Sequence, residues 1–177
     1  MTNPLFYAKI LLFGEYGIIE DSQGLTLPYS FYKGTLKFSE NQSDFEKKSN
    51  ESLSKYAQYL SELNLPEAFK INVEAFKKDI KKGLFFDSNI PQGYGVGSSG
   101  ALVAAIFEKY SFIKYNPEEI SKNQLKDLKK VFGELESYFH GKSSGIDPLI
   151  CYMNLPILIE NKESVDKVSI PKEEAGK

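Results

Sequence analysis

A glycine-rich stretch directly before a long apolar run is the feature that most constrains how this chain folds. Residues 90–101 read Ile-Pro-Gln-Gly-Tyr-Gly-Val-Gly-Ser-Ser-Gly-Ala, and the apolar run continues to Phe107. Glycines allow positive φ angles and let a ligand approach bare backbone N–H groups. The first N–H groups of a helix have no intrahelical partner, and the helix dipole favours an anion beside them. The stretch therefore predicts either a phosphate-binding loop or a flexible surface turn that enters a buried helix.

The residues around this loop narrow its interpretation. No lysine follows the last glycine, Gly100, so the loop is not a Walker A motif. A short apolar segment, residues 84–86, precedes the loop and has the composition of a β-strand. Strand, glycine loop and helix in this order are the context that a phosphate-binding loop requires, which favours the phosphate interpretation.

Composition limits the class of protein to which the chain can belong. Its 177 residues are 41% hydrophobic, with 11 tyrosines and 13 phenylalanines, which is enough for one well-filled core. The net charge of −2 gives no support to a nucleic-acid partner, and no apolar run approaches the roughly 18 residues of a membrane span. A single cysteine, Cys151, and an N-terminus without the basic stretch of a signal peptide predict a cytoplasmic protein.

The first forty residues predict a β-rich, antiparallel layer. Residues 5–13 form a strand-like run, and residues 18–19 and 25–37 are further strand candidates after turns. Lys9 is the only charge inside the first run. A charge in the middle of an apolar strand is costly unless it is paired, so Lys9 either extends to the strand edge or reaches a polar site.

The remaining chain predicts helices with short strands between them, joined by loops. The predicted helices are residues 51–66, 73–82, 98–112, and a last one from 118 or 123 to 139. Strands are predicted at residues 84–86, 149–152 and 156–159. Residues 40–50 are predicted to be a polar loop, and the polar tail from residue 160 is predicted to contain no element.

Three polar residues near the end of the last long helix each allow two interpretations. Glu136 lies at the margin of the apolar stripe, where it is either a solvated neighbour of that stripe or a ligand. His140, the only histidine, is either a structural group at the helix end or part of a site. Asp147 closes a second Gly/Ser loop, residues 140–148, where it either caps a turn or acts as a base or orienting group beside the first loop.

Taken together, three stretches resemble the motifs of the GHMP kinases, the superfamily of galactokinase, homoserine kinase, mevalonate kinase and phosphomevalonate kinase. Residues 7–16 resemble the first motif, a strand with a lysine followed by Phe-Gly-Glu-His, although Tyr16 replaces the histidine. Residues 91–101 resemble Pro-x-Gly-x-Gly-x-Gly-Ser-Ser-x-Ala. Residues 136–147 resemble the Glu-x3-His-Gly-x2-Ser-Gly-x-Asp stretch of mevalonate kinases and close relatives. The matches keep their order over residues 5–150.

This resemblance implies an α+β fold, the ribosomal protein S5 domain 2-like N-terminal domain of a GHMP kinase. It places the ATP-binding domain in residues 1–160, followed in residues 161–177 by a polar tail or by the start of a C-terminal domain. The family's third glycine-rich motif is not found in the sequence. The resemblance therefore implies that the C-terminal domain is missing from this chain, which would be an N-terminal portion, a truncated product or one half of a split protein.

The resemblance also assigns roles to individual residues. ATP and Mg²⁺ are the implied cofactors, with Mg²⁺ bound by Ser99 and Glu136. Asp147 is the implied general base, and Lys9 is implied to lie beside it and to stabilise charge on the transferred phosphoryl group. The residues implied to hold the ATP phosphates are Pro91, Gly93, Gly95, Gly97, Ser98, Ser99 and Gly100. Those implied to surround the acceptor are Glu15, His140, Ser144 and Gly145.

The implied activity is an ATP- and Mg²⁺-dependent phosphorylation of a primary hydroxyl on a small-molecule alcohol. Conversion of mevalonate to phosphomevalonate, a step of isoprenoid precursor synthesis, is the reaction that the third motif favours. A sugar, homoserine or phosphomevalonate kinase is an alternative within the superfamily. A non-catalytic nucleotide-binding module is an alternative outside the enzyme class, because the C-terminal domain is missing. The expected partner is a second copy in a homodimer or a separate C-terminal half.

Overall fold

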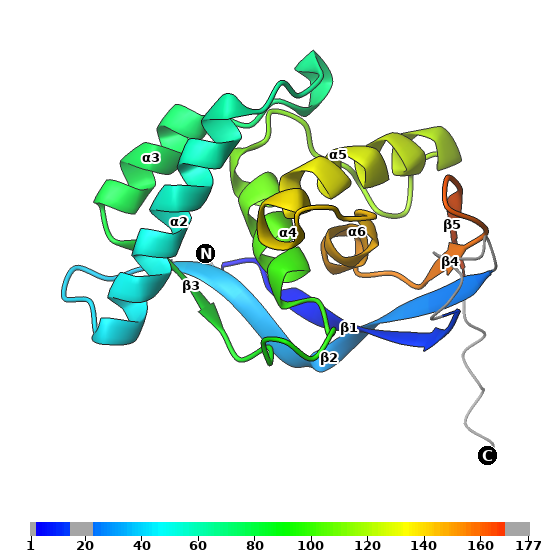
Figure 1. Cartoon of the computed structure of the whole chain (residues 1–177), viewed down its shortest axis with the longest axis horizontal. Helices are drawn as coiled ribbons and strands as arrows, with labels where there is room; N and C mark the ends of the chain where they lie inside the picture. The colour runs from blue at the N-terminus through cyan, green and yellow to red at the C-terminus, as the bar shows by residue number, and fades with distance from the viewer. Residues whose placement is uncertain (1–2, 15–22, 169–177) are drawn as a thin grey trace.

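One antiparallel sheet carries the helices on a single face (Figure 1). The structure is a computed structural model and describes residues 3–14 and 23–168. The strands are β1 (Phe6–Phe13), β2 (Gly24–Phe38), β3 (Leu84–Ser88), β4 (Ile157–Ile159) and β5 (Val165–Lys167). The helices are α2 (Asp44–Glu62), α3 (Val73–Lys81), α4 (Ser98–Tyr110), α5 (Lys122–His140) and α6 (Ile146–Met153), with a 3₁₀ turn at Glu67–Phe69. The predicted α+β class is confirmed.

Strand β2 organises the sheet because it pairs with three other strands. Its first part pairs with β1 and β4, its last part pairs with β3, and β5 extends the sheet beyond β4, all antiparallel. The pairing with β1 changes register between Tyr7–Lys33 and Ala8–Tyr29, so residues 30–32 bulge out of the ladder. This geometry confirms the antiparallel layer predicted for the start of the chain, with residues 24–38 forming one strand.

Helix α4 lies at the centre of the core. Eight of its 13 residues are buried, because it packs against β1 and β2 on one side and against α5 and α6 on the other. Phe107 meets Phe132 edge-on at a ring distance of 5.0 Å and Tyr152 at 5.4 Å. An almost continuous apolar helix is stable only when neighbours surround it, which is why this segment fixes the positions of the elements around it.

Three sequence predictions were wrong, each for a local reason. Residues 149–152 belong to α6 and not to a strand, since a short apolar run cannot be assigned from periodicity alone. Residues 44–50 are helical and not a loop: Ser43 and Glu46 form a capping box, and the polar residues that follow lie mostly on the solvent side of α2. The polar tail contains an element, because residues 165–167 pair with β4. The strand predicted at residues 18–19 lies outside the described residues.

Gly145 offers a test of how closely the start of α6 is packed. Its φ is 75°, and a Cβ would lie 1.9 Å from the carbonyl oxygen of Lys129 on α5. Gly141, with φ 71°, has nothing within 4 Å of the equivalent position and is a matched control. We expect Gly145→Ala to lower the free energy of unfolding by about 3 kcal/mol or more, and Gly141→Ala by about 1 kcal/mol, from backbone strain alone. Chemical denaturation measures both, and equal losses would contradict the close packing.

Candidate active site

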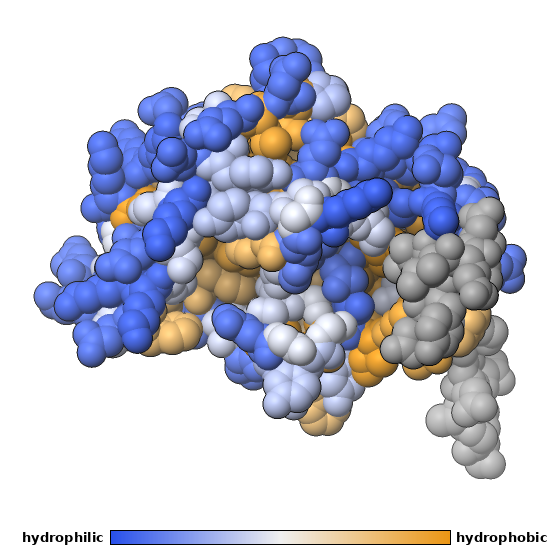
Figure 2. Space-filling model, in the orientation of Figure 1, coloured by the Kyte–Doolittle hydropathy of each residue, from blue (hydrophilic) through white to orange (hydrophobic). Residues whose placement is uncertain are grey.

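A cavity of about 840 Å³ lies between the first half of α2 and the glycine-rich loop. The same cavity is reached by the end of α5 and the start of α6, so segments distant in sequence meet around it. On the face drawn in Figure 2, hydrophilic residues cover much of the outer surface and apolar residues show in its recessed centre. The residues that line the cavity include Phe45, Lys48, Leu53, Phe86, Pro91, Gly93, Gly95, Gly97, Ser98, Ser99, His140 and Asp147.

The wall formed by the loop depends on glycine for its backbone conformation. Gly93, Gly95 and Gly97 have φ angles of 82°, 68° and 84°, a region that other residues rarely adopt. The loop is attached to the sheet, because the Lys9 N–H donates to the Val96 carbonyl oxygen at 3.0 Å. The chain therefore crosses the edge of β1 and enters α4 with Gly97 as the N-cap residue.

The start of α4 presents free N–H groups to the cavity. The Ala101 N–H donates to the Gly97 carbonyl oxygen at 2.9 Å, so the three amides before it have no acceptor within the helix. Ser98 and Ser99, which carry two of these amides, line the cavity. The aligned peptide dipoles add a positive potential at the same place. This end of the cavity therefore favours an anion.

Lys9 and Asp147 meet beside this helix end. The Lys9 ammonium lies 3.0 Å from Asp147 Oδ1, and the two side chains are 12% and 30% exposed. Lys9 therefore reaches a polar partner, which decides between its two interpretations. Asp147 lies in the first turn of α6 and not in a loop, a position where the helix dipole stabilises a carboxylate. Gly100 allows the first turn of α4 to lie against the first turn of α6, because a Cβ on Gly100 would lie 2.7 Å from the Asp147 carbonyl carbon.

Glu136 is buried, with only 3% of its surface exposed, so the interpretation as a solvated neighbour of the stripe was wrong. Its Oε1 accepts a hydrogen bond from the Ser99 hydroxyl at 2.8 Å, and its Oε2 accepts one from the Ser143 hydroxyl at 2.5 Å. His140 Nε2 lies 2.9 Å from the same Ser99 oxygen. Burial raises the pKa of Glu136 above its ordinary value, while the hydrogen bonds from the two serines act in the opposite direction.

Two of the residues expected around the acceptor have local structural partners instead of cavity contacts. Ser144 is half-buried, and its hydroxyl accepts from the Ile146 N–H at 3.4 Å at the start of α6. Gly145 is buried against the backbone of α5. Glu15 lies outside the described residues. Sequence reasoning missed Ser143, because two adjacent serines in a loop give no signal as to which one faces the carboxylate.

The donor set fits a hard divalent cation that is shared with a ligand. Glu136 and Ser99 offer a carboxylate and a hydroxyl oxygen next to the anion-favouring end of α4. In the described part of the chain no three histidine, cysteine or acidic side chains gather as a metal cluster. Mg²⁺ typically takes one or two protein oxygens, several waters and phosphate oxygens, and it does not need a cluster made only of protein ligands.

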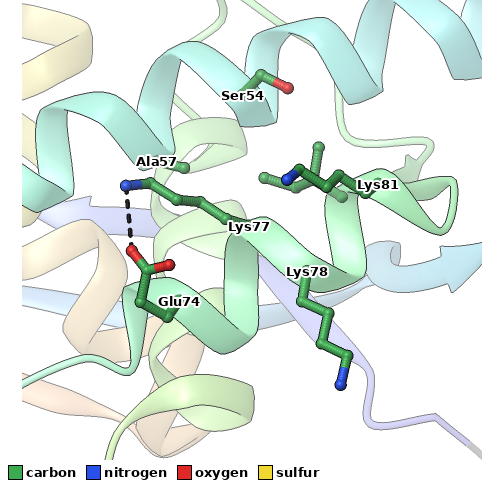
Figure 3. A pocket seen from close by; sticks show the side chains of 7 residues that line it. Ser54, Ala57, Glu74, Lys77, Lys78 and Lys81 are labelled. Carbon is green, nitrogen blue, oxygen red and sulfur yellow. Dashed lines mark hydrogen bonds and ion pairs between the residues drawn. The ribbon is translucent and has the colours of Figure 1, made fainter.

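A second cavity lies between α2 and α3 and has a different character. It measures about 310 Å³, and Figure 3 shows Lys77, Lys78 and Lys81 of α3 around it, with Lys77 paired to Glu74 at 3.3 Å. All four of these side chains come from α3, and none belongs to a motif. The first cavity is therefore the candidate active site.

Comparison with known proteins gives the class of this chain. The family model described as GHMP kinases N terminal domain matches residues 52–154, which is more than half of the chain. The chain therefore belongs to the GHMP kinase family. No curated protein matches this chain at a significant level. Separately, no helix within residues 3–14 and 23–168 is long and apolar enough to cross a membrane.

Among solved structures the chain is similar to mevalonate kinases. The mevalonate kinase of Methanococcus jannaschii has a TM-score of 0.55 and 17% identity, with 95% of this chain and 56% of that chain covered. L. major mevalonate kinase in complex with R-mevalonate has a TM-score of 0.55 and 14% identity, with 97% and 53% covered. At such identities the likeness concerns the fold. The chain spans about half the length of these kinases.

The burial of the Glu136 carboxylate predicts how the stability of a Glu136→Gln variant depends on pH. The raised pKa of Glu136 means that ionisation costs more in the folded than in the unfolded chain. This cost is fully present above the raised pKa and disappears as the pH falls toward the ordinary carboxyl range. We therefore expect Glu136→Gln to be at least as stable as the original chain at pH 8 without divalent metal. Thermal unfolding at pH 8 and pH 5 measures the difference, which should shrink at pH 5; a growing difference would contradict the burial cost.

Proposed function

We propose that this chain is the nucleotide-binding part of an ATP- and Mg²⁺-dependent GHMP kinase that phosphorylates a primary hydroxyl, with mevalonate as the acceptor. The observation that carries the proposal is the meeting of two polar pairs at one helix end. Lys9–Asp147 and Ser99–Glu136 both lie at the start of α4, next to a glycine loop with free amides. Family membership supports a kinase, and the third motif supports the acceptor.

In this proposal the protein supplies position and charge to a phosphoryl transfer. Loop amides between Gly93 and Ser99 hold the phosphates of the nucleotide. The substrate hydroxyl oxygen attacks the terminal phosphorus, the bond to the ADP oxygen breaks, and the hydroxyl proton passes to the Asp147 carboxylate. Lys9 pairs with Asp147 and lies close to the charge that develops on the phosphoryl oxygens. Ser99 and Glu136 would hold Mg²⁺, which would neutralise part of the phosphate charge.

The far end of the cavity fits the nucleoside. Phe45 and Leu53 of α2 and Phe86 of β3 form apolar walls there, and Lys48 and Ser49 add polar groups. A volume of about 840 Å³ is within the range of small-molecule and cofactor sites. We propose that the base and ribose lie between α2 and the loop, with the phosphates directed toward the start of α4.

The acceptor is tested by an assay over several alcohols. ADP release is measured with mevalonate, phosphomevalonate, homoserine and galactose as acceptors, at fixed ATP and Mg²⁺. Turnover with mevalonate supports the proposal. Turnover with another acceptor and none with mevalonate retains the GHMP kinase chemistry but overturns the acceptor.

A non-catalytic nucleotide-binding module is the second candidate function. It is favoured by one observation: of the residues expected around the acceptor, Ser144 and Gly145 have local structural partners and do not line the cavity. Calorimetric titration of the 177-residue chain with a non-hydrolysable ATP analogue separates binding from turnover. Binding without ADP release from any acceptor would favour the module over the enzyme.

The role of Asp147 gives a direct test of the chemistry. We expect Asp147→Asn to lower the turnover number by about 10²–10⁴-fold, because the amide cannot accept the hydroxyl proton. Asp87→Asn is a matched control, since Asp87 also pairs with a lysine, Lys37 at 2.6 Å, but lies on exposed sheet surface. The control should leave turnover unchanged. Retained activity in Asp147→Asn would rule out Asp147 as the base.

A further inference from the structure

The hydroxyl of Ser143 touches both of the segments that carry the acidic residues of the candidate site. Its Oγ donates to Glu136 Oε2 at 2.5 Å and accepts from the Gly145 N–H at 3.0 Å. Gly145 is the N-cap residue of α6 and stands two positions before Asp147. The Ser143 N–H in turn donates to the Ser137 hydroxyl at 3.3 Å, which holds the serine itself in place.

We propose that Ser143 is a positioning residue that orients the Glu136 carboxylate toward Ser99 and holds it to the start of α6. The inference rests on the proposed function, because it concerns the carboxylate that would bind Mg²⁺. It assigns to Ser143 a role that neither the glycine loop nor the third motif contains, since the motif leaves this position open.

The geometry explains why a hydroxyl is needed at this point. A carboxylate has two oxygens, and the Ser143 hydroxyl occupies Oε2, so that Oε1 is the one directed at Ser99. Glu136 is too buried for water to replace this contact easily. In the described residues two serine hydroxyls, and no lysine or arginine, bond the Glu136 oxygens, so the carboxylate can take a cation as a further partner. Loss of a residue that hydrogen-bonds to a metal ligand typically lowers the metal affinity by about 10–100-fold.

A purely structural role for Ser143 predicts a different outcome. If the hydroxyl only supports the turn before α6, its loss would weaken the fold and lower every kind of binding equally. If it orients Glu136, its loss would weaken only the binding that passes through Mg²⁺. The affinity for a nucleotide with and without the metal separates the two roles, because the hydrogen bonds of Ser143 go to Ser137, Glu136 and Gly145, outside the glycine loop.

The experiment compares Ser143→Ala, Ser143→Thr and the control Ser61→Ala in the 177-residue chain. Ser61 is exposed on α2, and its hydroxyl donates to the local Gln58 carbonyl oxygen at 2.6 Å. The dissociation constant of a non-hydrolysable ATP analogue is measured by calorimetry in Mg²⁺ and in EDTA. We expect Ser143→Ala to weaken binding about tenfold in Mg²⁺ and to leave it unchanged in EDTA. Ser143→Thr, which keeps the hydroxyl, should restore the affinity, and Ser61→Ala should match the original chain in both buffers.

Each other result overturns a specific statement. Unchanged affinity of Ser143→Ala in Mg²⁺, or an equal loss in Mg²⁺ and EDTA, overturns the positioning role while the proposed function stands. An original chain that binds the analogue equally well in both buffers overturns the Mg²⁺ site and with it the role of Ser143. An original chain that does not bind the analogue in either buffer overturns the proposed function itself.

Discussion

The contact between the first turns of α4 and α6 determines the geometry of the candidate site. Gly100 makes it possible, because any side chain there would meet the backbone of Asp147 and Pro148 at 2.7–2.8 Å. The contact brings two positive helix ends together and places Lys9 beside them. Such a concentration of positive potential is unfavourable unless an anion balances it. Asp147 supplies one negative charge, and the open loop beside it leaves room for a phosphate.

Glu136 shows the opposite arrangement, a negative charge placed where water cannot reach it. Two hydroxyls, and not a lysine or arginine, bond its oxygens in the described structure. Hydroxyls compensate only part of the cost of burying a carboxylate, which is why its pKa is raised. A residue that serves only stability would be poorly chosen at this position. The arrangement is understandable if a cation completes it when nucleotide binds.

The sequence predicted the parts of the site that depend on local chemistry. The glycine loop and the helix after it are specified by adjacent residues, and Lys9 stood out because a charge inside an apolar strand needs a partner. The burial of Glu136 was not predictable from the helix stripe, because the groups that contact its oxygens, Ser99 and Ser143, lie outside α5. Residues 149–152 were assigned to a strand because a four-residue apolar run fits either a strand or a helix. The two caps of α6, Gly145 and Asn154, both have αL conformations, and they were not recognised as helix ends.

The groups proposed for nucleotide and metal differ in one respect from those proposed for the acceptor. Lys9, the loop, Glu136 and Asp147 are held by a single packed unit around α4, so their relative positions follow from the core of this chain. The residues expected around the acceptor do not form one such unit. His140 lies against Ser99, Ser144 bonds to the start of α6, and Gly145 packs on α5. In the proposed function, nucleotide binding rests on groups that the core around α4 holds in place, whereas phosphorylation also depends on how the acceptor is held opposite Asp147.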